Sequence, residues 1–374
     1  MQKTISIYYT DVIKPIKETD IYKWLTEKYT VIIDSKNPEF LFYDIFGDDY
    51  KKYNNCVKIF VPTEDETANF NECDYAAGFA RISYGDRYFH RSFCLDELEP
   101  SIQQRSFDAA ALLNRKFCNF IYSNSNCGEG AFLRQEFCKK LMKYKHVDCP
   151  GKVLNNMDRS VIDDVYVGDW RESKRQFQSQ YKFTIAFEND ATDGWVTEKM
   201  PDAIRAYSIP IYYGDPGINN DFNEKAFINL ADYDYDLDKL VQRVIELDNN
   251  DEEYLAMLRE QPLSTKFQFD GNERFKNWIY SIIEKGNKPL NKDPRNISRN
   301  KKSMRAIKKW YRAEHNIPDE DLQNTINTSA ILAKNKIYCL KILKYTILYK
   351  FSFGKKQKKY KEKYNELIQK FEEI

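Results

Sequence analysis

Short apolar runs alternate with helix-like runs along the first 115 residues, and this alternation limits the fold more than any other feature of the chain. ISIYYTDVI, VIIDS, FLFYDIF and VKIFVP have the composition of strands, whereas TDIYKWLTEKY repeats its apolar residues at helical spacing. Strands that alternate with helices predict a mostly parallel sheet with both faces covered. We therefore expect residues 1–115 to form one α/β domain.

A second series of the same kind begins at Lys116. Its strand-like runs are KFCNFIYSN, HVDCP, YKFTIAFEN, IPIYYG and AFINL. Helical segments are expected between and after them, at about 131–144, 170–180, 197–206 and 235–262. Two open sheets in tandem would enclose a cleft beside the carboxyl ends of their strands, where such sheets bind ligands.

The predicted fold class is therefore α/β, with two Rossmann-like domains, 1–115 and 116–286, that face a central cleft. A chain of 374 residues is long enough for two such domains. From about residue 287 the composition becomes polar and then rich in lysine, so residues 287–374 are expected to form a helical, basic tail.

Charge and cysteine spacing exclude several classes of protein. The 58 basic and 57 acidic side chains give a net charge of +1, so we expect no nucleic-acid partner. The eight cysteines include no C-x-x-C pair and are interpreted as reduced thiols, mostly in the core. The N-terminus has no signal-peptide core, and no apolar run approaches the roughly 20 residues that span a bilayer, so a cytoplasmic location is expected.

The segment from Tyr181 to Gly214 has the order strand, polar loop, helix, strand and glycine turn, which is typical of a ligand-binding edge. Thr197 fits the N-cap of the helix. Lys199 and the N–H groups of the first turn could hold a diphosphate, and the carboxylate of Glu198 suits the hydroxyls of a ribose. Ordinary helix capping with a solvated lysine explains the same three residues.

The run FENDATDGWVTEKMPDAIRAYSIPIYYG resembles the signature of the bacterial α-1,3/4-fucosyltransferase family, which reads approximately FEN, a spacer, VTEK and IPIYWG. The likeness extends through FLRQEF and YLAMLREQPL in the second domain, and through IFVPTEDETANFNECDYAAGF and DRY in the first. The resemblance implies a GT-B fold in which the second domain binds GDP-fucose and the first presents the acceptor.

The resemblance also assigns residues to the donor. It places Lys199 and Arg134 on the diphosphate and Glu198 on the ribose, and Trp195 stands where a tyrosine is usual, so a hydroxyl contact would be lost. Without the resemblance, Arg134 reads as a surface residue of a helix. The full predicted donor set is Ser123, Asn124, Arg134, Asn189, Trp195, Glu198 and Lys199.

Glu64 matches the glutamate that the family uses as general base, which takes the proton of the acceptor hydroxyl as that hydroxyl attacks. Glu66 is a rival, because two residues of one strand that are two positions apart share a face. The triplet Glu64 to Glu66 also reads as a simple acidic turn. Arg87 and Tyr88 recur in the resemblance at the border of the acceptor site, and surface or core roles fit them equally well.

The implied reaction is an inverting displacement from GDP-β-L-fucose to GlcNAc or Glc of a LacNAc or Lewis-type glycan, with an α-1,3 linkage. No metal is expected, because Arg134 and Lys199 would neutralise the departing diphosphate, and the acidic run at Asp232, Asp234, Asp236 and Asp238 reads as a helix start. A GT-B enzyme for another nucleotide sugar, and a non-catalytic module that binds glycan or nucleotide, are the alternatives.

The segment 334–363 carries eleven lysines and one glutamate among aromatic and aliphatic residues. This composition suits the surface of an anionic membrane. We therefore expect a peripheral enzyme on the cytoplasmic face of the cell membrane, although the apolar residues form no clean helical stripe. RNA binding and a solvated tail are the alternatives.

Overall fold

Two parallel sheets organise the chain, and each belongs to one domain. The computed structural model describes residues 2–12, 14–158 and 170–290. The first sheet has the order β2-β1-β3-β4-β5-β6, and all its neighbouring strands are parallel. Its strands are β1 (Thr4–Thr10), β2 (Thr30–Ile33), β3 (Phe40–Tyr43), β4 (Val57–Phe60), β5 (Tyr75–Gly78) and β6 (Tyr88–His90).

The second sheet has the order β11-β10-β9-β7-β8, again with parallel neighbours. All seven residues of its central strand β9 are buried, as expected for a strand covered on both faces. Its strands are β7 (Lys116–Asn119), β8 (Val147–Asp148), β9 (Tyr181–Phe187), β10 (Ile209–Tyr213) and β11 (Ile228–Asn229). The two parallel sheets confirm the predicted α/β class.

Helices cover both faces of the second sheet. Helix α4 (Gly128–Leu141) packs on α8 (Leu237–Asp248), and α6 (Trp170–Gln178) packs on α7 (Lys199–Arg205). The remaining helices are α1 (Asp20–Lys28), α2 (Phe93–Asp96), α3 (Ala109–Leu113), α9 (Asp251–Arg259) and α10 (Gly271–Lys285). The expected helices at 131–144, 170–180 and 197–206 are therefore present with shifted ends, and the helices expected across 235–262 are α8 and α9.

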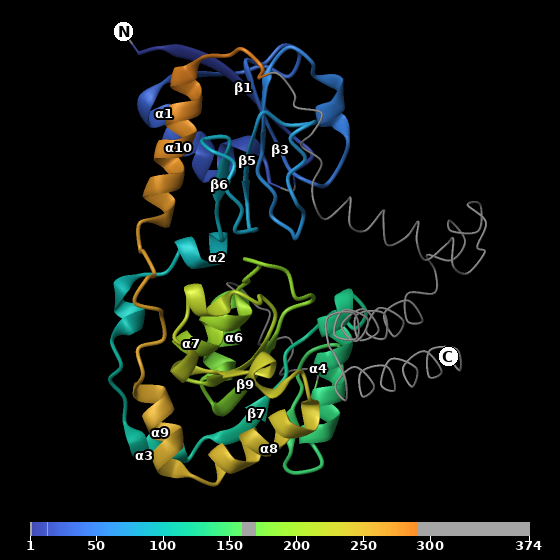
Figure 1. Ribbon diagram of the computed structural model, residues 1–374, viewed down its shortest axis with the longest axis vertical. Helices are drawn as coiled ribbons and strands as arrows, with labels where there is room; N and C mark the ends of the chain where they lie inside the picture. The colour runs from blue at the N-terminus through green and yellow to red at the C-terminus, as the bar shows by residue number, and fades with distance from the viewer. Residues whose placement is uncertain (1, 13, 159–169, 291–374) are drawn as a thin grey trace, which may run out of the picture.

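Helix α10 corrects the predicted division of the chain at its C-terminal side. It was assigned to the second domain, yet Figure 1 shows it beside α1 in the first. Its buried residues Phe275, Ile279 and Ile283 belong to the same apolar core as Ile5 and Ile7 of β1. The amphipathic pattern identified a helix, but which sheet would cover its apolar face depends on contacts distant in sequence.

The boundary at residue 115 also lies too late. Leu95 and Leu98 pack with Met200 of α7, and Leu112 belongs to the core of the second sheet. The Arg115 guanidinium donates to the carbonyl oxygens of Ala206 and Tyr207. Residues 93–115 therefore pack on the second domain, although they precede its first strand.

The carboxyl edges of the two sheets face each other. Asp65, in the loop after β4, accepts a hydrogen bond from Thr192, in the loop after β9. The Arg81 side chain, in the loop after β5, pairs with Asp215 after β10 at 2.7 Å. The predicted meeting of two Rossmann-like domains at the carboxyl ends of their strands is therefore confirmed.

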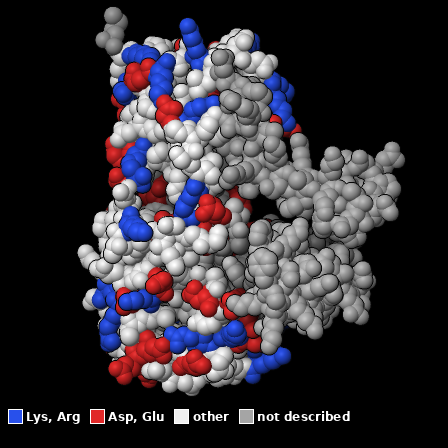
Figure 2. Space-filling model, viewed as in Figure 1, with Lys and Arg blue, Asp and Glu red and all other residues white. Residues whose placement is uncertain are grey.

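Basic and acidic side chains are interspersed over the described part of the face in Figure 2. This mixture accords with the near-zero net charge. Among residues 2–12, 14–158 and 170–290, no helix is long and apolar enough to cross a membrane. The predicted tail segment 334–363 lies outside these residues.

The cysteines that can be placed agree with the interpretation as thiols. Six of them are buried and one, Cys127, is exposed, and Cys138 and Cys149 approach each other with their sulfur atoms 3.9 Å apart. Cys339 lies outside the described residues.

Candidate active site

The candidate site lies where the second sheet reverses its strand order, between β7 and β9. The chain leaves β7 toward α4 on one face and leaves β9 toward α7 on the other, so the loops 120–127 and 188–198 diverge there. Ligands of open α/β sheets bind at such a switch point. A side chain at Gly130 would place its Cβ 2.0 Å from the Glu188 carbonyl oxygen, so only glycine lets α4 approach the end of β9 this closely.

A buried ion pair joins the end of β9 to the start of α7. The Glu188 side chain has no solvent exposure, and its carboxylate accepts hydrogen bonds from the Thr197 N–H at 2.8 Å and from the Lys199 Nζ at 2.9 Å. Burial favours the neutral amine of Lys199, but the carboxylates of Glu188 and Glu198 outweigh it and raise its pKa. Lys199 is therefore a fixed cation.

The N-cap of α7 differs from the prediction, which placed Thr197 there. Helix α7 begins at Lys199 with Glu198 in the N-cap position, and Glu198 has helical backbone angles and makes no capping bond with its side chain. The hydroxyl of Thr197, which was expected to cap the helix, instead donates to the Glu188 carboxylate at 2.8 Å.

Glu198 is held between two lysines. Its Oε1 lies 3.5 Å from the Nζ of Lys174 and 3.7 Å from the Nζ of Lys199. Burial alone would raise the pKa of Glu198, but the two ammonium groups overcome that effect and lower it to about 2. Glu198 is therefore ionised throughout the physiological range and offers two acceptor oxygens.

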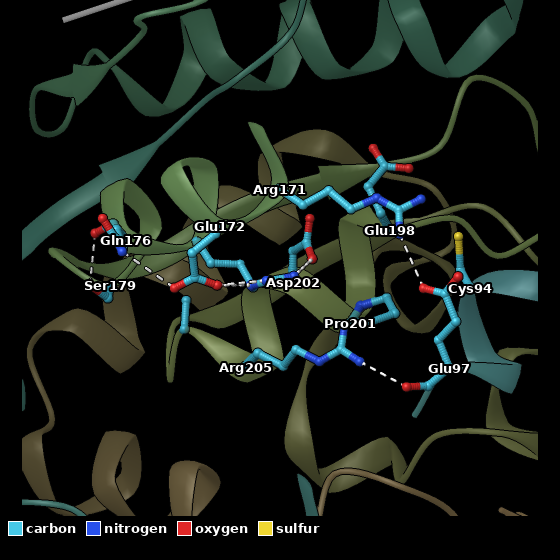
Figure 3. Close-up of a pocket in the computed structure, with 12 residues that line it drawn as sticks. Cys94, Glu97, Arg171, Glu172, Gln176, Ser179, Glu198, Pro201, Asp202 and Arg205 are labelled. Carbon is cyan, nitrogen blue, oxygen red and sulfur yellow. Dashed lines mark hydrogen bonds and ion pairs between the residues drawn. The ribbon is translucent and has the colours of Figure 1, made fainter. Parts of the chain in front are cut away.

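A cavity of about 680 Å³ opens between α2, α6 and α7. Figure 3 shows Glu198 on its wall together with arginines and acids of α6 and α7. Of the predicted donor residues, the cavity reaches Glu198 and none of the others. The candidate site therefore lies at the switch point, and this cavity adjoins it through Glu198. The lining residues are Cys94, Glu97, Arg171, Glu172, Arg175, Gln176, Ser179, Glu198, Pro201, Asp202, Arg205 and Ala206.

Arg134 is only 1% exposed and thus is no surface residue of α4. Its guanidinium donates to Asn189 Oδ1 at 2.8 Å and to the Asn124 carbonyl oxygen at 2.6 Å, and it lies over the Tyr122 ring at 3.9 Å. Its Nε is buried and bonds no described residue. Asn124 itself accepts two backbone N–H groups within its turn, and Ser123 is exposed on the same loop. The structure thus brings Arg134, Asn124 and Asn189 together.

Trp195 lies differently from the expectation. The resemblance places it in the donor set, whereas here the residue is 6% exposed and its ring meets Phe79 of the first domain edge to face, with ring centroids 4.3 Å apart. Its indole therefore contributes to the contact between the domains.

Glu64 lies in an exposed turn after β4, within electrostatic reach of the donor residues. Partial burial raises its pKa, Lys199 lowers it, and the carboxylates of Asp44 and Glu198 raise it further, with a net increase. Thr63, beside Glu64, donates its hydroxyl to the buried Asp44 at 2.6 Å, which fixes the turn. The charge of Lys199 in the second domain therefore acts on Glu64 in the first, across the junction where Thr192 bonds Asp65, the neighbour of Glu64.

Glu66 does not share a strand face with Glu64, because β4 ends at Phe60 and the Glu66 N–H bonds the Glu64 carbonyl oxygen in a tight turn. Arg87 and Tyr88 have internal roles. Arg87 donates to the carbonyl oxygen of Asp74 at 2.8 Å, and the buried Tyr88 donates its hydroxyl to the Ala80 carbonyl oxygen at 2.8 Å. Tyr88 thus lies in the core of the first domain, and Arg87 is half-buried beside it.

Two family models match the chain, and together they cover both domains. The N-terminal domain of α-(1,3)-fucosyltransferase FucT matches residues 7–94, and the C-terminal domain of glycosyltransferase family 10 (fucosyltransferase) matches residues 113–278. The chain belongs to glycosyltransferase family 10. Residues 95–112, between the two matched ranges, belong to neither model.

Individual relatives support the family 10 assignment. The chain is 31% identical over 302 residues to the α-(1,3)-fucosyltransferase FucT of Helicobacter pylori, covering 70% of this chain and 59% of that protein. It is 27% identical over 188 residues to GDP-fucose protein O-fucosyltransferase 3 of Xenopus tropicalis, covering 50% of this chain and 36% of that protein. The chain thus spans less than two thirds of either relative.

A solved structure, an α1,3-fucosyltransferase with GDP, resembles the whole described fold. Its TM-score is 0.59 at 25% identity, and the match covers 76% of this chain and 91% of that chain. The GT-B architecture predicted for the family 10 chain is therefore confirmed.

Glu188 is the residue of this family 10 site that sequence reasoning missed. It stands in the middle of the FEN motif, directly after a strand of seven buried residues. A carboxylate at the buried end of an apolar strand requires a cationic partner, because an unpaired buried charge is costly. This need for a cation, together with Lys199 eleven positions later, could have identified the ion pair from the sequence.

The acidic run at 232–238 has a structural role where it can be placed. Asp236 caps α8 and accepts the N–H groups of Asp238 and Lys239. Within the described ranges of the chain, no group of three or more His, Cys, Asp or Glu side chains is arranged to hold a metal ion.

Replacement of Glu188 by Gln should loosen the start of α7. Gln keeps the shape and an acceptor for Thr197 but removes the charge that holds Lys199, so we expect the free energy of unfolding to fall by about 3 kcal/mol. Affinity for GDP should fall roughly tenfold, because a charged hydrogen bond fixes Lys199. Urea unfolding and calorimetric titration with GDP measure the two effects.

Glu246→Gln is the matched control for this variant, since Glu246 lies exposed on α8. It should leave both quantities at their wild-type values. Wild-type GDP affinity in Glu188→Gln would contradict a role of the buried pair in placing Lys199.

Proposed function

We propose that this chain transfers L-fucose from GDP-β-L-fucose to a sugar hydroxyl of a glycan, with inversion at the anomeric carbon. The proposal specifies an α-1,3 linkage to GlcNAc or Glc of a LacNAc or Lewis-type acceptor. The observation that carries it is the domain junction at the switch point of the second sheet: Asp65, the neighbour of Glu64, accepts a hydrogen bond from Thr192, and Lys199 and Glu198 act electrostatically on Glu64. Membership in family 10 supports the choice of donor.

The donor would be held by groups of opposite charge. The fixed ammonium of Lys199 and the guanidinium of Arg134, whose buried Nε–H bonds no described residue, fit the oxygens of the diphosphate. The ionised carboxylate of Glu198 fits the two ribose hydroxyls as acceptor. Asn189, which accepts from Arg134, orients that guanidinium. This arrangement supplies cationic side chains where charge develops on the leaving group.

The transfer needs one displacement. The Glu64 carboxylate takes the proton from the acceptor hydroxyl while its oxygen attacks the anomeric carbon and the bond from that carbon to the β-phosphate oxygen breaks. GDP leaves with both electrons of that bond, and Lys199 and Arg134 stabilise its growing negative charge more than they stabilise the bound substrate.

Glu64→Gln should remove the base and keep the donor site. We expect kcat to fall roughly 100-fold or more with GDP affinity unchanged. Glu66→Gln, a matched change two residues away in the same turn, should retain activity. Equal turnover in wild type and Glu64→Gln, or loss in Glu66→Gln alone, would contradict the assignment, and so would turnover of GDP-mannose or UDP-galactose without turnover of GDP-fucose.

The pH dependence of the wild type follows from the same residue. A base works only when ionised, and the pKa of Glu64 is raised, so kcat/KM should fall as pH decreases through a value above the usual pKa of a glutamate. The acid limb of the profile for kcat/KM measures this value, and the limb should disappear from the residual activity of Glu64→Gln.

An apolar ledge on the same edge of the first sheet as Glu64 supports a sugar as acceptor. Ile45 and Phe46, which follow β3, are 36% and 45% exposed. The ledge is rigid, because the buried Asp44 accepts the Ile45 N–H at 2.7 Å and the Phe46 N–H donates to the Asp11 carbonyl oxygen at 3.2 Å. Asp44 also binds Thr63, so the ledge and the predicted base are held by one carboxylate. The C–H face of a pyranose can pack on the exposed aromatic ring of Phe46.

Phe46→Ala should therefore weaken acceptor binding selectively. We expect the KM for the oligosaccharide to rise about fivefold to tenfold, while affinity for GDP stays the same, because the loss of one aromatic contact acts on the first domain only. Initial rates at varied acceptor concentration give the KM. The control is Ile32→Ala, an equally exposed apolar residue on edge strand β2. An unchanged acceptor KM in Phe46→Ala would remove the ledge from the acceptor site.

We also propose peripheral attachment to the cytoplasmic face of the membrane through residues 334–363, on the evidence of their sequence alone. Deletion of residues 334–374 should abolish sedimentation with vesicles of phosphatidylserine and phosphatidylcholine and preserve activity on soluble acceptors. Vesicles of phosphatidylcholine alone are the control. Undiminished sedimentation of the shortened chain would contradict the proposal.

A further inference from the structure

One arginine of the first domain binds three carboxylates of the second. The Arg81 guanidinium lies 3.1 Å from an oxygen of Asp193, 2.7 Å from one of Asp215 and 2.5 Å from one of Asp221. The Arg81 N–H also donates to Asp193 at 2.8 Å. Burial opposes the charge of Arg81, but its bonds to Asp215 and Asp221 outweigh that effect and raise its pKa. Arg81 is therefore a permanent cation at the junction.

The carboxylate at the centre of this cluster also holds the donor loop. Asp215 has no side-chain exposure, and its Oδ1 accepts the N–H of Gly194 at 2.9 Å and the N–H of Gly217 at 2.8 Å. Three carboxylates gathered this closely repel one another unless a cation lies among them. The first domain supplies that cation, so its Arg81 stabilises the loop 192–198 in this position.

Steric contacts fix the same loop. Gly194 has φ of +76°, and a Cβ there would lie 1.8 Å from the Phe79 carbonyl oxygen, so only glycine fits. Trp195 packs on Phe79, and Thr192 bonds Asp65, the neighbour of the predicted base. The residues 192–195 are thus held by two separate segments of the first domain, one at Asp65 and one at 79–81. Thr197, Glu198 and Lys199 follow directly.

We propose that Arg81 is a positioning residue of the donor site: by holding Asp193 and Asp215 it fixes the loop that sets Glu198 and Lys199, so that GDP is bound tightly only when the two domains are docked. This inference rests on the proposed donor role of Glu198 and Lys199. The affinity for the nucleotide on one domain then depends on an arginine of the other.

Asp193→Asn separates this positioning role from general stability. Asp193 is 48% exposed and Arg81 keeps its buried bonds to Asp215 and Asp221, so the variant should fold and unfold like wild type. Arg81→Lys is the second variant, because lysine keeps the charge but lacks the planar fork that bridges several carboxylates. Arg243→Ala is the matched control, since Arg243 is 22% exposed and pairs with Glu253 at 2.6 Å within the second domain.

The experiment measures GDP affinity by calorimetry, KM for GDP-fucose and for the acceptor, and the melting temperature, all on the full chain. We expect Asp193→Asn and Arg81→Lys each to weaken GDP binding about tenfold. The double variant should bind GDP no more weakly than the weaker single variant, because the two residues act through the same interaction and their effects do not add. The KM for the acceptor should not change, and Arg243→Ala should bind GDP like wild type.

Wild-type GDP affinity in both folded variants would overturn the positioning role and leave the donor assignment intact. An equal loss of GDP affinity in Arg243→Ala would overturn it too, because the effect would then be general destabilisation. Failure of the wild-type chain to bind GDP would overturn both the inference and the proposed donor, so the two failures are distinguishable.

Discussion

The ion pair between Glu188 and Lys199 determines how the donor site is built. A carboxylate without solvent contact at the end of β9 requires a cation and hydrogen-bond donors, and the chain supplies them from Thr197 and Lys199. Satisfying this one charge brings the start of α7 against the end of β9. Glu198 is thereby directed toward Lys174, and the cation that fits a diphosphate is fixed in the absence of any ligand. The site is preorganised because the ion pairs of Lys199 with Glu188 and Glu198 hold these side chains in place.

The same principle operates between the domains on a larger scale. The second domain carries Asp193, Asp215 and Asp221, and the first carries Arg81 and the predicted base Glu64. The donor loop lies between them, touched by Phe79 and Asp65 from the first domain and continuous with Glu198 in the second. The proposed reaction takes its base from one domain and its cations from the other, and this loop contacts both domains. The acceptor ledge of Ile45 and Phe46 belongs to the same edge of the first sheet.

Local patterns were enough to predict the two sheets, because apolar strands buried on both faces form continuous runs in sequence. They also drew attention to Glu198 and Lys199 within one motif, but ordinary helix capping explained these residues until the resemblance favoured a donor site. Arg134 and Glu64 depended on the resemblance, since burial of one and the approach of the other to Lys199 arise from residues far apart in the chain. The packing of Trp195 could not be predicted for the same reason: its ring meets Phe79, more than a hundred residues earlier. Helix α10 shows the limit most clearly, because its amphipathic pattern cannot tell which of two sheets it will cover.

The return of α10 to the first domain gives the chain an unusual order of completion during synthesis. Phe275, Ile279 and Ile283 are part of the core around β1, yet they are made only after every strand of the second domain. The first domain therefore leaves the ribosome with an uncovered apolar surface and must wait for about 180 further residues, because domains fold as units while synthesis proceeds at roughly 5–20 residues per second. The donor domain, whose own strands and helices are contiguous, can finish folding first. Until α10 is made, the face of the first domain that it covers stays open to solvent, and exposed apolar surface of this kind is prone to aggregation.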